Sequence, residues 1–430
     1  MKKIEAVLVG AGQRGAEAYA SYALKYPNEI QFIAVAEPND YRRERFGDVH
    51  NIPKEMRFRS WEELLDRPQL CEAALICTQD KMHFAPAAKA ITRGYNLLLE
   101  KPISPDPGEC LRLASLAETT GKLMMIGHVL RYTPFFKTIK ALLKEERIGQ
   151  IISIQHNENV GYWHYAHSFV RGAWRNREES SPMILAKSCH DMDILLYLIG
   201  SNCLRLASFG RLTYFNQNNA PPGSAKRCTD GCRIEADCPY SALKIYLDSE
   251  KKGWPVSVIT ADLSPEGILR ALKEGPFGRC VFHCDNNVVD HQVVTMEFEN
   301  QVTVSFTMCG FTNEISRTLK IMGTRGEIRG NMEKSEIKVY DFATGRVDTI
   351  QIKEQKMGHS GGDEGLMREF VRQLRGEGTE DLALATKMAV QSHLMAFAAE
   401  ESRLTGKTVD LEQFIKGVKE EMIGLNGQRN

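Results

Sequence analysis

The stretch Gly10-Ala11-Gly12-Gln13-Arg14-Gly15 decides the fold that we expect for the first part of the chain. It has the spacing G-x-G-x-x-G, it ends the apolar run that begins at Ile4, and it opens a helical pattern that continues to Lys25. In this setting the glycines permit a tight turn and a close approach of the backbone to a pyrophosphate, and the helix N-terminus offers it free N–H groups. We therefore expect this loop to bind a dinucleotide through Gly10, Gly12, Gln13, Arg14 and Gly15.

A carboxylate stands where the ribose of such a dinucleotide is usually held. Glu37 ends a second apolar run that begins at Gln31, and it lies 22 residues after Gly15. A carboxylate at this place accepts hydrogen bonds from the ribose hydroxyls and repels a 2′-phosphate, so the sequence favours NAD over NADP. Arg42 and Arg43 follow closely and keep some NADP binding open.

Apolar runs and helical patterns alternate through the first part of the chain. Further buried strands are expected at 73–78, 96–100 and 123–126, and helices at 83–93 and 107–119. Short apolar runs that alternate with helices are typical of a parallel sheet that is covered on both faces. Residues 1–127 are therefore predicted to form an α/β, NAD-binding Rossmann domain.

The pattern changes to antiparallel strands in residues 128–430. Alternating apolar residues in 294–298 and 302–306 predict a hairpin that turns at Glu299-Asn300. An open, mainly antiparallel sheet needs a cover on one face, and a partner subunit is a common cover. We therefore expect a second α+β domain for substrate binding and oligomerisation, with a polar insertion loop at about 216–240. The other expected elements are a helix at 135–145, strands at 151–160, 204–212, 319–322 and 337–340, and two closing helices near 365–375 and 384–403.

The composition of the chain excludes several classes of protein. The 430 residues include 55 basic and 55 acidic side chains, so the basic excess of a nucleic-acid binder is missing. No window approaches the ~20 apolar residues that a membrane helix needs, and the N-terminus has no apolar signal core. Eleven cysteines, an odd number, indicate reduced thiols. These features predict a cytoplasmic protein without a nucleic-acid or membrane partner.

The segment Glu100-Lys101-Pro102 ends an expected strand of the first domain. Together with the glycine fingerprint and residues 77–83, 321–328 and 399–409, it resembles the Gfo/Idh/MocA oxidoreductase family over almost the whole chain. The resemblance implies a Rossmann domain, an open-sheet α/β domain, and a homo-oligomer such as a dimer or a tetramer. It also implies pyridine-nucleotide oxidation or reduction of hydroxyls on sugars, inositols or related compounds, and some relatives use a retained NAD to cleave glycosides.

The resemblance implies roles for single residues near the nicotinamide. Lys101 is expected beside the ring, and His190, just before a second-domain helix, is expected to face it. Chemistry at a carbinol needs a base for the hydroxyl proton while the hydride leaves, and a lysine serves near neutral pH if burial or nearby cations lower its pKa. The cofactor side of the site is expected to include Thr78, His83, Glu100 and Lys101.

The chain departs from the family pattern just before His190. The pattern places an Asp four residues before this histidine, and here that position is Ala186. Either the mechanism or the pose of the substrate must therefore differ. Lys187 is a further catalytic candidate because it adds a second cationic group, and its alternative is a surface lysine at a helix start.

Aromatic, His and Arg side chains concentrate in residues 162–175. Sugars present apolar faces and many hydroxyls, which suit aromatic rings and forked donors, although a packed loop or a subunit contact explains the cluster equally well. The polar loop 358–363 precedes a helix, and relatives carry a similar stretch near the substrate. An alternative role for its Asp363 is to cap that helix. The candidates for substrate binding are His164, Arg171, Trp174 and His359.

Cysteines cluster in the insertion and again at 280–284. Three or four thiolates suit a structural zinc or an iron–sulfur cluster, but the spacing matches no standard finger, and free cysteines in a loop are the alternative. The candidate metal ligands are Cys228, Cys232, Cys238 and Cys284.

These observations predict an NAD-dependent dehydrogenase that acts on a hydroxyl of a sugar, a glycoside or a cyclitol. The first alternative is an NAD-retaining glycosidase that oxidises a ring hydroxyl transiently. The alternative from another class is a nucleotide-binding sensor or scaffold without turnover. The loss of the family Asp favours this last alternative, and the presence of Lys101 and His190 disfavours it.

Overall fold

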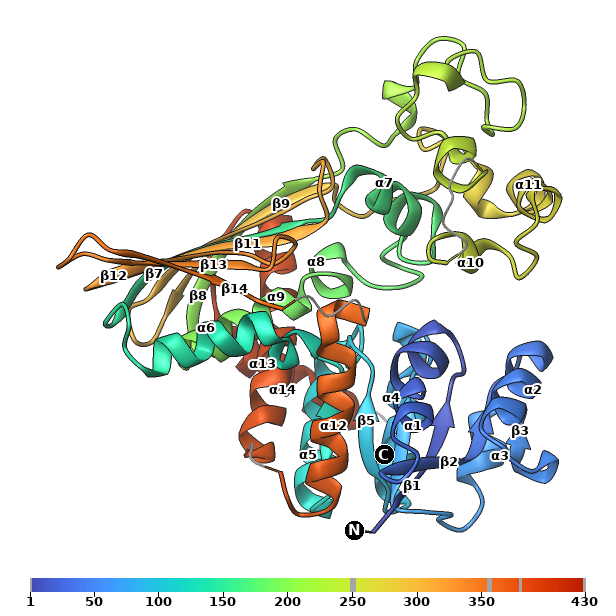
Figure 1. Ribbon diagram of the computed structural model, residues 1–430, viewed down its shortest axis with the longest axis horizontal. Helices are drawn as coiled ribbons and strands as arrows, with labels where there is room; N and C mark the ends of the chain where they lie inside the picture. Colours follow the sequence, from blue (N-terminus) through green and yellow to red (C-terminus); the bar gives the residue numbers. More distant parts are fainter. Residues whose placement is uncertain (1, 248–252, 354–357, 379–380, 428–430) are drawn as a thin grey trace.

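The computed structural model describes residues 2–247, 253–353, 358–378 and 381–427. Its strands form two sheets, and helices surround the smaller sheet and separate it from the larger one (Figure 1). A further lobe of short helices and loops extends from the end of the larger sheet. None of the helices in the described ranges combines the length and the apolar composition that a membrane span requires.

The first sheet is the parallel sheet that the sequence predicts. Its order is β3-β2-β1-β4-β5-β6, and every pair of neighbours is parallel. Alternate residues of a strand enter the apolar cores on opposite faces, as Leu8 and Val9 of β1 do. The short β3 has too few residues to give a sequence signal. The strands are β1 (Ile4–Val9), β2 (Ile30–Ala36), β3 (Arg57–Phe58), β4 (Ala73–Ile76), β5 (Asn96–Leu99) and β6 (Met124–Ile126).

Helices cover both faces of the first sheet. The helix expected from Arg14 to Lys25 is divided at Ala20, whose N–H bonds to the carbonyl oxygen of Gly15 at 2.9 Å. The helices expected after β4 and β5 are present, and α5 begins with the capping contact from Asp106 to Glu109 N. The helices of this part are η1 (Gln13–Tyr19), α1 (Ser21–Lys25), α2 (Asp40–Val49), α3 (Trp61–Leu65), α4 (Phe84–Thr92) and α5 (Pro107–Thr120).

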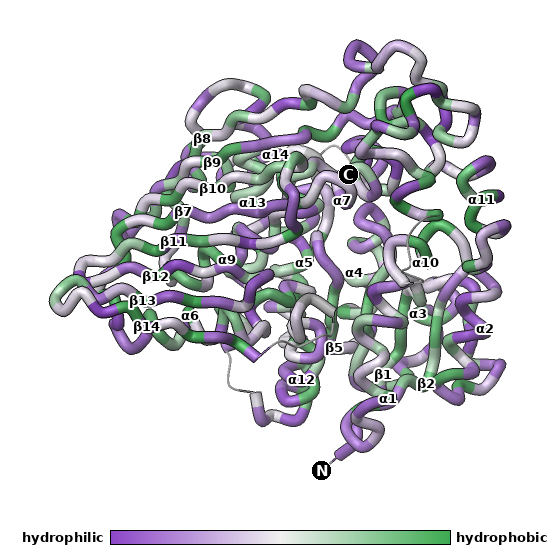
Figure 2. The backbone as a smooth tube through the Cα atoms, turned by 45° about the horizontal axis from the view of Figure 1, so that its top comes forward, coloured by the Kyte–Doolittle hydropathy of each residue, from purple (hydrophilic) through white to green (hydrophobic). Residues whose placement is uncertain are grey.

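The second sheet has nine strands in the order β14-β13-β12-β11-β7-β10-β9-β8-β15, and only β7 and β10 pair in parallel. The predicted hairpin is confirmed, because Val304 pairs with Met296 and Phe306 with Val294. Hydrophilic and hydrophobic residues mix along these strands (Figure 2). The strands are β7 (Ile151–Asn159), β8 (Cys203–Arg211), β9 (His291–Phe298), β10 (Thr303–Cys309), β11 (Ser316–Gly323), β12 (Gly326–Asn331), β13 (Glu336–Asp341), β14 (Val347–Gln351) and β15 (Val409–Asp410).

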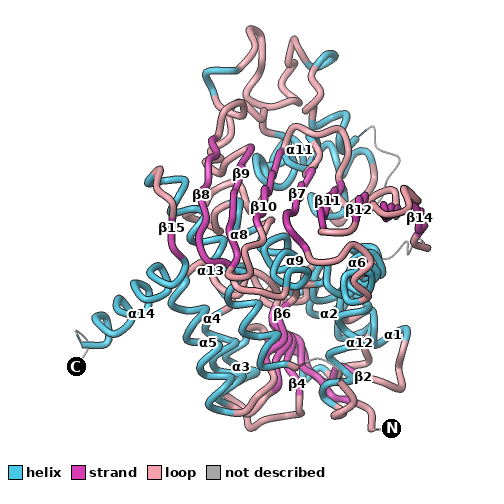
Figure 3. Tube along the Cα trace, turned by 90° about the vertical axis from the view of Figure 1, so that its left-hand side faces the viewer, coloured by secondary structure: helices cyan, strands magenta, loops and turns pink. Residues whose placement is uncertain are grey.

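Helices cover one face of the second sheet, on the side of the first sheet (Figures 1 and 3). They are α6 (Pro134–Lys144), α9 (Cys189–Ile199) and α13 (Leu382–Thr405). The long α13 joins the two cores, because Leu394 packs with the first sheet and Met395 with the second. The other face carries exposed apolar side chains, namely Ile152, Leu204, Phe209 and Val293.

Two expectations for the second part of the chain are wrong. The insertion is longer than 216–240, because residues 213–247 and 253–289, between β8 and β9, lie outside the sheet and form a lobe with its own small core around Tyr246. The lobe contains α10 (Val256–Ile259) and α11 (Pro265–Glu274). Three helices, not two, end the chain: α12 (Gly362–Leu374), α13 and α14 (Leu411–Gly427). The amphipathic α12 returns to the first sheet, where Phe370 is fully buried.

Candidate active site

Each glycine of the loop after β1 is required for a different structural reason. Gly10 has φ +91°, and a Cβ there would lie 2.6 Å from the carbonyl oxygen of Cys77. A Cβ on Gly15 would lie 2.2 Å from the carbonyl oxygen of Gly10, so helix and strand could not pack as closely. A Cβ on Gly12 would meet nothing within 4 Å. The open space at Gly12 fits the approach of a pyrophosphate to the loop, as the sequence predicts.

Glu37 lies against this loop at the end of β2. Its carboxylate accepts hydrogen bonds from Ala11 N at 2.8 Å and from Asn39 N at 3.0 Å. The side chain of Arg43 is buried and donates to the carbonyl oxygen of Glu37 at 2.8 Å, so it is not available to a 2′-phosphate. Arg42 is exposed. This arrangement fits NAD better than NADP.

Arg14 connects the glycine loop to two distant acids. It forms ion pairs with Glu100, at the end of β5, and with Asp363 in the first turn of α12. Burial raises the pKa of the Glu100 carboxyl, but the charges of Arg14 and Lys101 outweigh burial and hold it below its usual value. Asp363 is not the helix cap that we considered, because the N-cap of α12 is Gly361 and makes no side-chain hydrogen bond.

Thr78 and His83 fix the loop that follows β4. The ring nitrogens of His83 lie 2.6 Å from the carbonyl oxygen of Pro102 and 3.1 Å from that of Thr78. The hydroxyl of Thr78 donates to the carbonyl oxygen of Met82 at 2.9 Å. These contacts join the loop to the Glu-Lys-Pro segment, so both residues shape the cofactor side of the site through the backbone.

Lys101 reaches from the end of β5 to the second domain. Its Nζ donates a hydrogen bond to the carbonyl oxygen of Ala186 at 2.8 Å, at the end of α8 (Met183–Ala186). The position at which the family pattern has an Asp therefore offers its main-chain oxygen to Lys101. The contact places the cofactor edge of the first sheet beside the segment that contains Lys187 and His190.

Lys187 is not a surface lysine. Its side chain is 18% exposed, and its Nζ lies 3.3 Å from Glu158 Oε1. Burial lowers the pKa of the Lys187 ammonium; the charge of Glu158 opposes this effect, and those of Arg317 and Lys101 add to it. The group therefore gives up its proton at a lower pH than an exposed lysine, which suits proton transfer.

His190 lies in the first turn of α9 and is buried. Its ring centroid is 5.7 Å from that of His128, in an edge-to-face arrangement. Burial lowers the pKa of His128 strongly, and Arg131 and Lys101 lower it further, so His128 is neutral. The ring of His128 therefore presents a neutral, buried surface behind His190.

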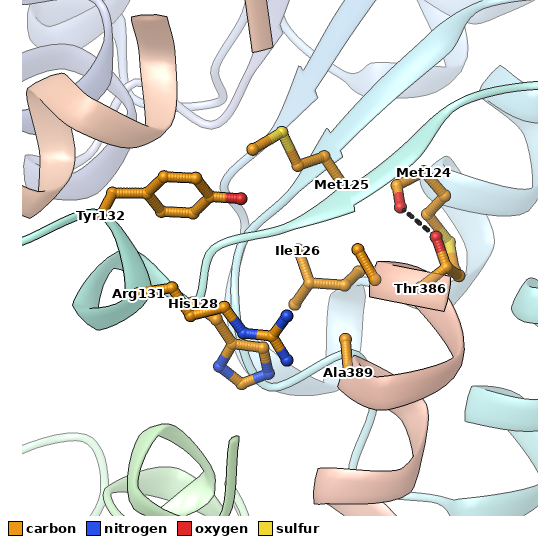
Figure 4. Close-up of a pocket in the computed structure, with 9 residues that line it drawn as sticks. Met124, Met125, Ile126, His128, Arg131, Tyr132, Thr386 and Ala389 are labelled. Carbon is orange, nitrogen blue, oxygen red and sulfur yellow. Dashed lines mark hydrogen bonds between the residues drawn. The ribbon is translucent and has the colours of Figure 1, made fainter. Parts of the chain in front are cut away.

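A small cavity lies on the other side of His128 (Figure 4). Its volume is about 20 Å³, which is about the space of one water molecule and far too little for NAD or a sugar. Arg131 lies beside His128 at its wall and binds Asp193 through two nitrogens. The cavity is therefore not a substrate pocket.

The inner face of the second sheet contains a cluster of buried polar side chains that was not expected from the sequence. Arg317 binds Asp191 at 2.7 Å and Glu158 at 2.6 Å, and His156 lies 2.8 Å from Asp191. Burial raises the pKa of the Asp191 carboxyl, but Arg317 and His156 outweigh it and hold the pKa low. One signal was available: His156 and Glu158 share the inward face of β7 with Ile154, where an apolar strand face would be expected.

The candidates for substrate binding differ in position. Burial lowers the pKa of His164 well below its usual value, and the nearby charge of Lys187 lowers it further. Trp174 is 38% exposed and its Nε1 lies 3.4 Å from Asp80 of the first domain. The structure does not support the expectation that Arg171 contacts the substrate, because its guanidinium is buried and donates to the carbonyl oxygens of Arg279 and Tyr240 at 2.7 Å. The side chain of His359 lies outside the described residues.

Among the described residues, the cysteines of the insertion are not gathered into a metal-binding group. Within residues 2–247, 253–353, 358–378 and 381–427, no group of three or more His, Cys, Asp or Glu is arranged to hold a metal ion. The Cys228 sulfur accepts a hydrogen bond from Ala242 N at 3.4 Å, and Cys284 donates to the carbonyl oxygen of Cys280 at 3.3 Å. Cys232 and Cys238 are half-buried free thiols. The metal prediction at these four cysteines is therefore not supported.

Two family models match the chain and together cover most of it. Residues 4–128 match the NAD-binding Rossmann fold of the Gfo/Idh/MocA oxidoreductase family. Residues 140–411 match the C-terminal α/β domain of the same family.

Individual relatives are more distant. The protein YteT of Bacillus subtilis is 23% identical over 80% of this chain and 82% of its own length. The trans-1,2-dihydrobenzene-1,2-diol dehydrogenase of Sus scrofa is 29% identical over 35% of this chain and 44% of its own length, so that match spans less than half of the relative. The solved structure of levoglucosan dehydrogenase in complex with NADH has a TM-score of 0.69 at 16% identity, covering 95% of this chain and 99% of that one, which shows a shared fold.

Proposed function

The chain belongs to the Gfo/Idh/MocA family of NAD-binding oxidoreductases, and from this premise we propose that it transfers a hydride between NAD and a hydroxyl of a sugar, a glycoside or a cyclitol. The names of two similar proteins support a polyhydroxylated substrate, because one acts on a cyclic diol and the other on levoglucosan. The polar side chains close to the contact between Lys101 and Ala186, Lys187 and His190 among them, support the same class of substrate.

One observation carries the proposal most directly. The Nζ of Lys101 donates to the carbonyl oxygen of Ala186 at 2.8 Å, which joins the cofactor edge of the first sheet to the second domain. Two further basic groups, Lys187 and His190, follow within four residues of this contact. A carbinol held beside them would have a proton acceptor within reach of its hydroxyl.

NAD, when bound through Gly12 and Glu37, supplies the hydride acceptor. In the oxidation, one of Lys101 and His190 takes the hydroxyl proton while the hydride leaves the same carbon, and the other orients the hydroxyl. The products are a ketone and NADH, with the proton on the side chain. Lys187 is the third member of this basic group, and its lowered pKa supports a share in the handling of the proton.

The walls of the cleft suggest how a sugar is held. His164 adjoins Lys187, and its ring lies 4.9 Å from that of Trp254 in an edge-to-face arrangement. Trp174 stands at the contact between the second domain and the loop after β4. We propose His164 and Trp174 as substrate contacts, and His359 stays a prediction.

The assembly and the location of the protein are parts of the same proposal. The exposed apolar residues on the free face of the second sheet, Phe209 among them, support a homo-oligomer such as a dimer or a tetramer. The eleven free cysteines support the reducing cytoplasm. We keep the division into domains at residues 127 and 128 as a proposal, with α12 returning to the first domain.

A panel of sugars, glycosides and cyclitols incubated with NAD tests the function. We expect one class to release NADH, measured at 340 nm, in proportion to the ketone formed. Release of free sugar without net NADH would instead support the NAD-retaining glycosidase. Tight NAD binding without either product over the whole panel would support the sensor or scaffold and contradict the dehydrogenase.

A further inference from the structure

Two buried acids and two other cations surround the Lys187 amine. Glu158 and Asp191 are negative and favour the protonated amine, whereas Arg317 and Lys101 are positive and disfavour it. Glu158 and Asp191 are at most 1% exposed, so solvent screens them little. Loss of the proton from Lys187 therefore removes one of the two cations that pair with the buried Glu158 carboxylate, which is unfavourable for that carboxylate.

Glu158 holds its position through the register of the second sheet. It stands directly opposite Arg317 on β11, and Arg317 Nη2 lies 2.6 Å from its Oε2. The other oxygen, Oε1, lies 3.3 Å from Lys187 Nζ. Because Arg317 is fixed in turn by two bonds to Asp191, Glu158 has one oxygen anchored and one directed at Lys187.

We propose that Glu158 is a positioning residue for the reaction: it holds the Lys187 ammonium in the cleft and sets the pH at which this group releases its proton. The inference rests on the proposed function, since it assigns Lys187 to the handling of the substrate proton. It also gives a reason why Ala186 needs no carboxylate, because the acid next to this basic group comes from β7 instead of from α8.

The groups that face Lys187 come from several elements. They are Glu158 of β7, Arg317 of β11, Asp191 of α9, Lys101 after β5 and His164 of α7 (Tyr162–Tyr165). Of these, the two acids favour the protonated amine, and Arg317 and Lys101 disfavour it. Replacement of Glu158 by Gln keeps the shape and removes one of the two acids, so the amine should lose its proton at a lower pH.

The first experiment measures the pH dependence of kcat/KM for NADH formation. In Glu158→Gln, the part of the kcat/KM profile that follows the titration of Lys187 should move to lower pH by about one unit or more, since an adjacent opposite charge shifts a pKa by about 1–3 units. Glu158→Asp should restore most of the native profile. Lys187→Met should remove that part of the profile, and adding Glu158→Gln to Lys187→Met should produce no further shift.

The matched control is Glu327→Gln. Glu327 lies on β12 of the same sheet, is nearly buried, and forms ion pairs with Lys320 and Arg329. This variant should lose some thermal stability but keep the native pH profile. An unshifted profile in Glu158→Gln, or an equal shift in the Lys187→Met background, would overturn the proposal.

A second experiment does not depend on turnover. The rate of acetylation of Lys187 by acetic anhydride, followed by mass spectrometry across pH, reports the pKa of this amine directly. The pKa of Lys187 obtained in this way should be lower in Glu158→Gln than in the native protein and unchanged in Glu327→Gln. An unshifted labelling curve would overturn the role of Glu158, even if no substrate is found. A shifted curve, together with no NADH formation on any substrate, would support the pairing of Glu158 with Lys187 and contradict only the proposed function.

Discussion

Arg14 Nη2 lies 2.8 Å from Asp363 Oδ1, although the two residues stand 349 positions apart in the sequence. Through this pair, Asp363 at the start of α12 fixes the side chain of Arg14, which lies in the glycine loop between Gly12 and Gly15. The same guanidinium binds Glu100 next to Lys101. The cofactor loop, the Glu-Lys-Pro segment and a helix from the end of the chain are therefore one connected unit.

Replacement of Asp363 by Asn should loosen this unit. The partly buried guanidinium of Arg14 loses one of its two acids, so the free energy of unfolding should fall by about 1.5–3 kcal/mol, the usual size of a hydrogen bond to a charged group. NADH should bind several-fold more weakly, as measured by fluorescence titration. Glu364→Gln, which changes the more exposed contacts to Lys25, Tyr26 and Arg368, should leave NADH binding unchanged. Equal NADH affinity in both variants would contradict the link.

Glu37 should decide the choice of cofactor. The native protein should bind NADH more tightly than NADPH, because the carboxylate repels a 2′-phosphate and Arg43 is already engaged by the backbone. Glu37→Ser should narrow the gap between the two dissociation constants. Glu44→Ser, on the exposed side of α2, is the control and should leave the preference as it is. A native preference for NADPH in the titration would refute this interpretation.

Lys101 and His190 should be needed for turnover but not for the binding of NAD. General acid–base groups contribute about 10²–10⁴-fold, so Lys101→Ala and His190→Ala should each lose rate on that scale. Lys187→Ala should also lose rate, because this side chain lies against Glu158 and not in solvent. Lys89→Ala, which removes a surface ion pair with Asp66, is the control. Near-native turnover in both the Lys101 and the His190 variants would defeat the mechanism.

The first domain was predictable because its signals are local. A glycine fingerprint, an acid at the end of β2 and five apolar runs stand in fixed order along the sequence, and each run is long enough to be a buried strand. The two-residue β3 was missed, because two residues contain no periodicity. The division of the first helix at Ala20 depends on the close approach of Gly15 to Gly10, which no local pattern reports.

The second domain was less predictable because its contacts are long-range. The hairpin of β9 and β10 follows from alternation, but the meeting of β7 with β10 and β11 joins residues about 150 positions apart, such as Ser153 and Thr303. Arg171 was assigned to the substrate because arginine suits sugars, whereas its real partners are carbonyl oxygens of the insertion. Glu158 and Arg317 become a pair only through the register of the sheet.

The buried histidine His393 should make the stability of the protein sensitive to mild acid. Its Nε2 accepts a hydrogen bond from Ile103 N at 2.9 Å, and its Nδ1 donates to the carbonyl oxygen of Ala389 at 2.7 Å. Only the neutral ring with its proton on Nδ1 satisfies both bonds. Burial, followed by the effect of His128, accordingly lowers the pKa of His393 to about 3.

The direction of the pH effect follows from this lowered pKa. Below about pH 6.5 the unfolded chain binds a proton at His393 and the folded protein does not. As the pH is lowered toward the pKa of the folded state, His393 therefore lowers the free energy of unfolding by about 1.4 kcal/mol per pH unit. His393→Gln keeps an oxygen that can accept from Ile103 N but does not titrate. Its unfolding free energy, from urea melts between pH 7 and pH 5, should therefore depend on pH less steeply by about one proton than that of the native protein. Parallel curves for the native protein and His393→Gln would show that His393 is not responsible.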